Sequence, residues 1–140
     1  MQSPQWRLTL FTLFCFLCTT VSFSQKREDL VGSWKIVKVE LAPDAPPEMK
    51  QGLDMLSQIM LNSTFQFKEN NSFSMDSPDA DLATKDGLWQ YNAQKKSIKV
   101  TERPVNGKQG VLMDITVQVK NGKYLFFMDE TSVILTVAKK

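Results

Sequence analysis

The sequence VLMDITVQVKNGKYLFFM, residues 111–128, contains two segments of alternating character joined by a short turn. Apolar side chains recur at every second residue from Val111 to Val119, which is typical of a half-buried β-strand. Asn121-Gly122 then favours a type I′ turn, because such a turn needs positive φ at both central residues. A second strand is expected over Tyr124–Met128. This stretch therefore predicts an antiparallel β-hairpin.

The same pattern extends outward along the chain. A further strand follows at 132–137, and others precede the hairpin at 34–41, 64–68, 72–75, 88–91 and 97–101, with a polar surface loop over 77–85. The alternation changes phase near Ile36, which indicates a β-bulge in the first strand. Short connections favour antiparallel neighbours. The sequence thus predicts an all-β fold, an eight-stranded antiparallel up-and-down barrel.

One segment departs from the strand pattern. Residues 48–61, EMKQGLDMLSQIML, place Met49, Leu53, Leu56 and Met60 on one stripe with helical spacing. Pro46 and Pro47 suit the first turn of a helix. We therefore expect one helix between the first and second strands, serving either as a lid over an apolar ligand or as a plug in the open end of the barrel.

The N-terminus has the three-part layout of a secretory signal peptide. A basic start is followed by an uncharged run over residues 8–21, and Ser22 and Ser24 lie at the −3 and −1 positions of a cut before Gln25. The run is short for a membrane span, although retention as an anchor is the alternative. We expect 1–24 to be a signal peptide and 25–140 one exported domain, secreted or periplasmic, with no membrane span.

Composition excludes several classes of chemistry. The chain has no histidine, and both cysteines, Cys15 and Cys18, lie in the predicted signal peptide. Histidine-based catalysis, cysteine catalysis and thiolate metal sites are thereby excluded from the exported domain. Nearly balanced charge, with 17 basic and 15 acidic residues, argues against a nucleic-acid binder. We expect no enzyme and no cofactor.

Three acidic residues form the best candidate for a metal site. Asp76, Asp79 and Asp81 give an oxygen-rich cluster of the kind that holds Ca²⁺, but the segment lacks the glycine and terminal glutamate of an EF-hand. The pattern favours a solvated loop, and no metal is expected.

Leu30-Val31-Gly32-Ser33-Trp34 carries a family resemblance. Gly32 and Trp34 at the start of the first of eight strands resemble the Gly-x-Trp signature of lipocalins. The segments Thr64–Phe67, Asn71–Phe73 and Gly87–Trp89 are similar to lipocalin-like domains of secreted bacterial envelope proteins. The resemblance implies a barrel that Trp34 closes at one end, with a cation from Lys139 or Lys140 over the indole.

The inward-facing side chains lead to two functional hypotheses. One is a cavity for a small apolar ligand at the helix-covered end. The other is a filled barrel that acts through its surface, as an interaction or envelope-structural module, with its protein partner unknown. The candidate lining residues are Phe65, Phe67, Phe73, Met75, Trp89, Tyr91, Met113, Ile115, Phe126 and Met128.

Overall fold

The computed structural model describes residues 25–140, so the predicted signal peptide, residues 1–24, lies outside the described residues. The described chain forms a closed barrel in which β1 to β8 follow one another in sequence order and all pairs are antiparallel. The predicted fold is confirmed. The strands are β1 Gly32–Leu41, β2 Thr64–Phe67, β3 Ser72–Asp76, β4 Thr84–Asn92, β5 Ser97–Glu102, β6 Val111–Lys120, β7 Lys123–Met128 and β8 Val133–Lys139.

The predicted bulge in β1 is confirmed. Ile36 pairs with Val137 of β8 and Lys38 pairs with Thr136, so Val37 is the extra residue. The shift brings Trp34 and Ile36 before the bulge, and Val39 and Leu41 after it, into contact with one core. Val37 itself is exposed, since the bulge turns it outward.

The hairpin at 121–122 has the expected backbone. Asn121 has φ 53° and Gly122 has φ 75°, as a type I′ turn requires. The loop predicted over 77–85 is shorter than expected, because β4 already begins at Thr84. The pairing of β4 with β3 shifts register between Phe73 and Met75. Because of this shift, the first residues of β4 do not show strict alternation, and the pattern did not predict them as strand.

The helical segment predicted between the first and second strands is present, and Gly52 divides it. The segment forms two helices, α3 Pro47–Gln51 and α4 Leu53–Leu61, separated by Gly52. Gly52 has φ −91° and ψ 0°, outside the helical region. Glycine disfavours the interior of a helix because it loses more backbone freedom on folding than any other residue. α4 packs against β1.

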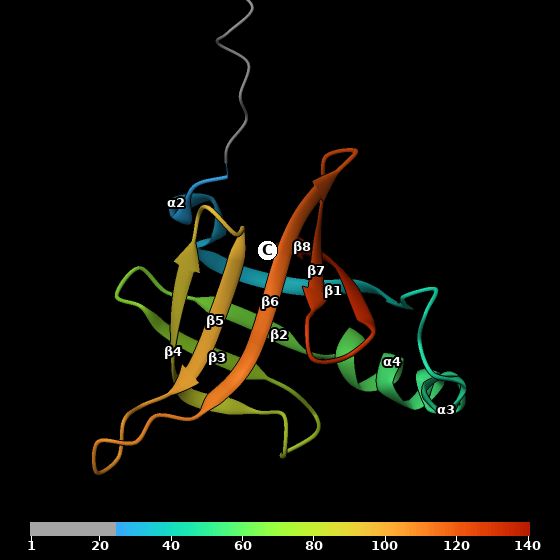
Figure 1. The fold of residues 1–140 in the computed structure, drawn as a ribbon, viewed down its shortest axis with the longest axis horizontal. Helices are drawn as coiled ribbons and strands as arrows, with labels where there is room; N and C mark the ends of the chain where they lie inside the picture. The colour runs from blue at the N-terminus through green and yellow to red at the C-terminus, as the bar shows by residue number, and fades with distance from the viewer. Residues whose placement is uncertain (1–24) are drawn as a thin grey trace, which may run out of the picture.

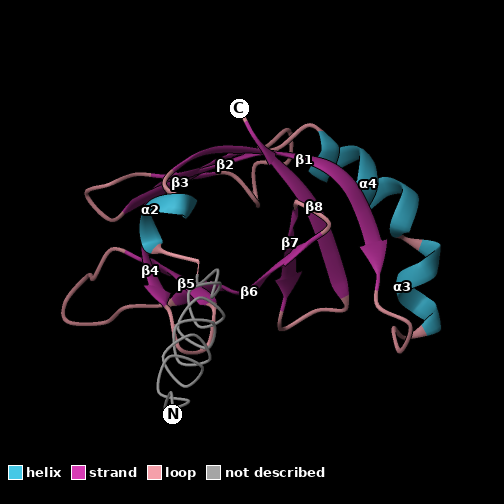
Figure 2. Ribbon diagram, turned by 90° about the horizontal axis from the view of Figure 1, so that it is seen from above, coloured by secondary structure: helices cyan, strands magenta, loops and turns pink. Residues whose placement is uncertain are grey.

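A third helix, α2 Arg27–Leu30, precedes β1 and was not predicted, since four residues are too few for a periodic pattern. α2 and α4 lie on opposite sides of the barrel (Figures 1 and 2). We call the two ends of the barrel the α2 end and the α4 end. Within residues 25–140, no helix combines the length and apolar character needed to cross a membrane.

Candidate functional site

An apolar pocket opens at the α4 end of the barrel. Its lining comes from α4, the ends of five strands and two of the connections between them. Its volume is about 230 Å³. The lining residues are Leu56, Met60, Met75, Asp81, Leu82, Thr84, Leu112, Met113, Met128, Thr131 and Val133. We call this the α4-end pocket.

Four methionines and three leucines make up most of this lining, and Asp81 is its one ionisable residue. Methionine is unbranched and polarisable, so its side chain adapts to ligands of irregular shape. A cavity of about 150 Å³ holds one benzene molecule. The α4-end pocket therefore suits an apolar group of roughly nine or ten non-hydrogen atoms, whereas pockets for drug-sized ligands begin near 300 Å³.

The middle of the barrel is filled by aromatic side chains. The rings of Phe67 and Phe73 lie 5.3 Å apart, and those of Phe67 and Trp89 lie 5.2 Å apart. Six of the ten candidate lining residues are completely buried in this core and do not border the pocket: Phe65, Phe67, Phe73, Trp89, Ile115 and Phe126.

Three of the ten candidates do line the pocket, namely Met75, Met113 and Met128. Tyr91, the remaining one, lies half-buried toward the α2 end, close to the end of β4. A ligand at the α4 end would thus rest on the three methionines. Leu82 and Thr131 also line the pocket and were missed, because they belong to connections where alternation gives no signal. Leu112 was missed because strict alternation assigns it to the outward face of β6, whereas it is the extra residue of a register shift against β5.

The candidate lid residues divide in the same way. Leu56 and Met60 of α4 form one wall of the pocket, and Met60 is buried. Met49 and Leu53 are half-buried; Met49 packs on the core from α3. Part of the predicted helical stripe therefore lines the pocket, and Met49 packs against the barrel core.

Trp34 lies at the α2 end, where the Gly-x-Trp resemblance implies it should close the barrel. The indole is 1% exposed, and its Nε1 donates a hydrogen bond of 2.8 Å to the carbonyl oxygen of Leu30. The Nζ of Lys139 lies 5.4 Å from the centre of the indole ring. The expected cation over Trp34 is thus confirmed, and Lys139 supplies it. The same Nζ donates to the carbonyl oxygen of Asp29 at 3.1 Å.

Two tyrosines share this end with α2. Burial, followed by the nearby Asp29 carboxylate, raises the pKa of Tyr124 above its usual value. The same two causes, and then Tyr124, raise the pKa of Tyr91. A phenol with a raised pKa is a poor base or nucleophile at neutral pH. Both phenols therefore remain protonated and uncharged at neutral pH.

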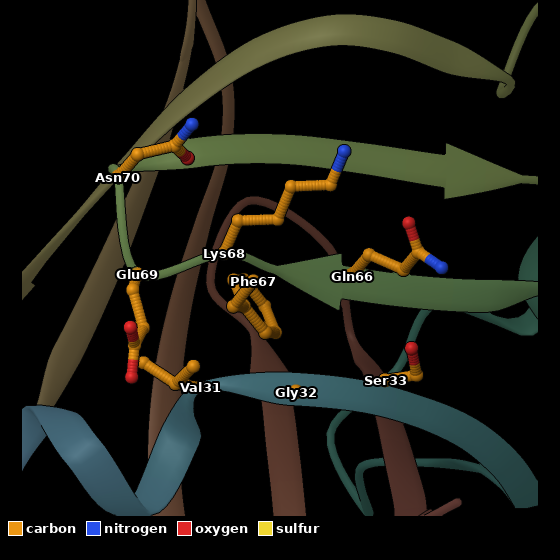
Figure 3. Close-up of a pocket in the computed structure, with 8 residues that line it drawn as sticks. All are labelled: Val31, Gly32, Ser33, Gln66, Phe67, Lys68, Glu69 and Asn70. Carbon is orange, nitrogen blue, oxygen red and sulfur yellow. The ribbon is translucent and has the colours of Figure 1, made fainter.

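A second hollow, of about 460 Å³, lies on the outside of the barrel where β1 runs beside β2 (Figure 3). Val31, Gly32 and Ser33 form one side, and residues 66–70 form the other. The Phe67 ring belongs to the core and is 1% exposed. Gln66, Lys68, Glu69 and Asn70 place polar groups along one side of this groove.

The acidic residues of the β3–β4 connection do not assemble a metal centre. No group of three or more metal-ligating side chains comes together within residues 25–140. Asp79 instead accepts a hydrogen bond from the backbone N–H of Asp81, as loop residues do. Asp81 faces the α4-end pocket, which its sequence context did not predict.

Comparison with known proteins adds little to this picture. No protein-family model matches the chain, and no curated protein matches it. The fold is similar to a crystal structure described as a DUF4847 family protein from Bacteroides vulgatus. That structure shares 14% sequence identity, with a TM-score of 0.46, over 78% of this chain and 92% of the other. The eight-stranded barrel is thus established by its own strand pairing, while the lipocalin resemblance stays a prediction.

Proposed function

We propose that this protein is an exported, non-catalytic binding protein that holds a small apolar ligand, or the apolar end of a larger one, in the α4-end pocket. The observation that carries the proposal is the pocket itself, about 230 Å³ in volume and lined mainly by methionine and leucine. Export rests on the N-terminal sequence pattern.

The position of the pocket supports a ligand that enters from solvent. Leu82 and Leu112 line the pocket and are each 36% exposed, so apolar surface leads from the outside into the site. Exposed apolar surface around a concave site is typical of ligand-binding grooves. Below the pocket, Met75 is 3% exposed and belongs to the packed core, so the ligand would stop at that level.

Titration with butylbenzene, followed by ligand-detected NMR, tests the proposal. Burying on the order of 200 Å² of apolar ligand surface contributes about 5 kcal/mol before the cost of immobilising the ligand, so we expect a Kd on the order of 0.1 mM or weaker. Leu112→Trp narrows the mouth of the pocket and should abolish saturable binding. Its matched control is Val111→Trp, since Val111 is the neighbouring residue and does not line the pocket.

The proposal is contradicted if both variants bind butylbenzene saturably. It is also contradicted if neither the unmodified protein nor Val111→Trp binds butylbenzene saturably. Each variant is first checked for an unchanged circular dichroism spectrum, because only a folded barrel has the pocket.

One observation favours a second function, that of an interaction module. α4 presents Met55, which is 71% exposed, and Leu61, which is 47% exposed, and Val111 is 51% exposed at the same end of the barrel. Exposed apolar groups of this kind can form a contact surface for a protein. Sedimentation velocity over a range of concentrations tests whether the surface joins two copies. Association that Met55→Lys removes, together with no binding of butylbenzene, would establish this second function in place of the first.

A further inference from the structure

Charge is distributed very unevenly between the two ends of the barrel. In an up-and-down meander, successive turns lie at alternate ends, so charges that are scattered along the sequence gather in space. The α2 end comprises residues 25–31, 68–71, 93–96, 120–123 and 139–140. It carries nine basic side chains and three acidic ones. The basic residues are Lys26, Arg27, Lys68, Lys95, Lys96, Lys120, Lys123, Lys139 and Lys140.

The α4 end has the opposite balance. Its connections, residues 42–63, 76–83, 102–110 and 129–132, carry nine acidic side chains and three basic ones. The net charges of the two ends almost cancel, and for this reason the net charge of the whole chain is close to zero. In Figure 1 the β4–β5 and β6–β7 turns of the α2 end lie at the top, and the β5–β6 connection of the α4 end lies at the bottom.

The cations of the α2 end are available to a partner. Eight of the nine are exposed; Arg27, which stacks on Trp89, is partly covered. The structure shows two side-chain ion pairs within residues 25–140, Lys38–Glu40 and Arg103–Asp86, and neither uses a cation of the α2 end. Lys139 makes its contacts with the Trp34 ring and with a backbone carbonyl rather than with a carboxylate. No local acid therefore neutralises this surface by direct pairing.

We infer that the α2 end docks on an anionic lipid surface. Clustered lysines near a membrane that contains anionic lipids are attracted by its surface potential, and each adds to the affinity. The cations come from five separate segments around one end, so many of them can approach a membrane together. Val119, next to Lys120, is 49% exposed and offers an apolar contact within the same surface.

The aromatic residues of this end argue against nucleic acid as the occupant. Proteins that bind single strands combine cations with exposed aromatic rings on which bases stack. Here Trp34 and Trp89 are buried, and Tyr91 and Tyr124 are half-buried. The surface provides positive charge without a stacking platform, which suits lipid headgroups better than bases.

Vesicle flotation with the full chain tests this inference. Vesicles with about 30 mol% phosphatidylglycerol are compared with purely zwitterionic ones, because anionic headgroups supply the attraction. Residues 1–24 are the same in every variant, so a difference between variants in the preference for anionic vesicles reports the charges within residues 25–140. We expect at least a tenfold preference for the anionic vesicles near 0.1 M salt, and its loss near 1 M salt, where the screening length falls to about 3 Å.

Two matched variants locate the surface. Replacing Lys68, Lys95, Lys120 and Lys123 together by glutamine removes four exposed cations from the α2 end and should reduce the preference about tenfold or more. The control replaces Lys38, Lys50, Lys85 and Lys108 by glutamine, which makes the same change in net charge away from that end and should leave the preference within about twofold.

Equal losses in the two variants would show that net charge alone governs binding and would overturn the inference. So would the absence of any preference for anionic vesicles, or binding to single-stranded DNA but not to vesicles. If the first variant fails to keep the thermal transition of the unmodified protein, the salt dependence of the unmodified protein and of the control decides instead: a preference that persists near 1 M salt excludes an electrostatic surface.

Discussion

Replacing Gly32 by alanine tests two features of the α2 end at once. Gly32 begins β1 with φ 137°, a conformation that residues with a Cβ rarely adopt. A Cβ at this position would lie 2.7 Å from Cε of Lys139, the side chain that lies over Trp34. Gly32→Ala therefore strains the backbone and also displaces Lys139.

The two costs can be estimated separately. Backbone held in a region that only glycine favours costs about 1–3 kcal/mol. Loss of the cation over Trp34 costs about 0.5–1 kcal/mol more. We expect Gly32→Ala to lower the free energy of unfolding by about 3 kcal/mol, and the Tm by about 10 °C or more for a domain of this size.

Urea unfolding of a double-mutant cycle separates the terms. In a Lys139→Ala background the steric conflict is absent, so the cost of Gly32→Ala should fall to about 2 kcal/mol, the backbone strain alone. Gly52→Ala is the control, because no atom lies within 4 Å of its added Cβ and its φ of −91° is open to alanine. The reasoning is refuted if Gly32→Ala costs less than about 0.5 kcal/mol, within the range of ordinary surface changes.

Three further predictions concern the core and the α2 end. Phe67→Ala should cost about 3–5 kcal/mol in urea unfolding, since the ring packs against four other aromatic rings; a cost near 1 kcal/mol would mean that the core collapses around the gap. Arg27→Lys should cost about 1 kcal/mol, because lysine keeps the charge but not the planar guanidinium 4.6 Å above Trp89, and an unchanged unfolding midpoint would show that the stacking contributes nothing. Raised pKa values of Tyr91 and Tyr124 contribute stability that is present below pH 10 and is lost as the pH rises through the folded-state values. The double Tyr→Phe variant should therefore lose less stability above pH 10 than the unmodified protein, and identical pH profiles would contradict this.

The barrel was predictable because its strands have one buried face. Phe65 and Phe67, or Ile98 and Val100, alternate with polar neighbours, and such alternation fixes both the strand and its orientation. The bulge near Ile36 was also predictable, because the apolar residues after it alternate in the opposite phase to those before it. α2 could not be found in this way, because its four residues depend on tertiary contacts such as the bond from Trp34 to the Leu30 carbonyl.

The candidate site was only partly predictable for a different reason. Alternation tells which face of a strand is inside, but not the depth along the barrel at which a side chain lies. Phe126 and Met128 belong to the same inward set of β7, yet Phe126 is in the filled core and Met128 lines the pocket. The charge separation did have a signal in the sequence. Alternate turns of a meander share an end, so summing charges over every second turn would have detected it.

The pairing of β1 with β8 has a consequence for how the protein folds. Lys120 and Lys123, which pair across the β6–β7 turn, are three residues apart, whereas Trp34 of β1 pairs with Lys139 of β8, 105 residues away. The entropic cost of closing that loop exceeds the cost of the hairpin by about 3 kcal/mol. Hairpins should therefore form early and the β1–β8 seam last. Until the seam forms, both strands present open edges, so two chains refolding at high concentration can exchange their terminal strands.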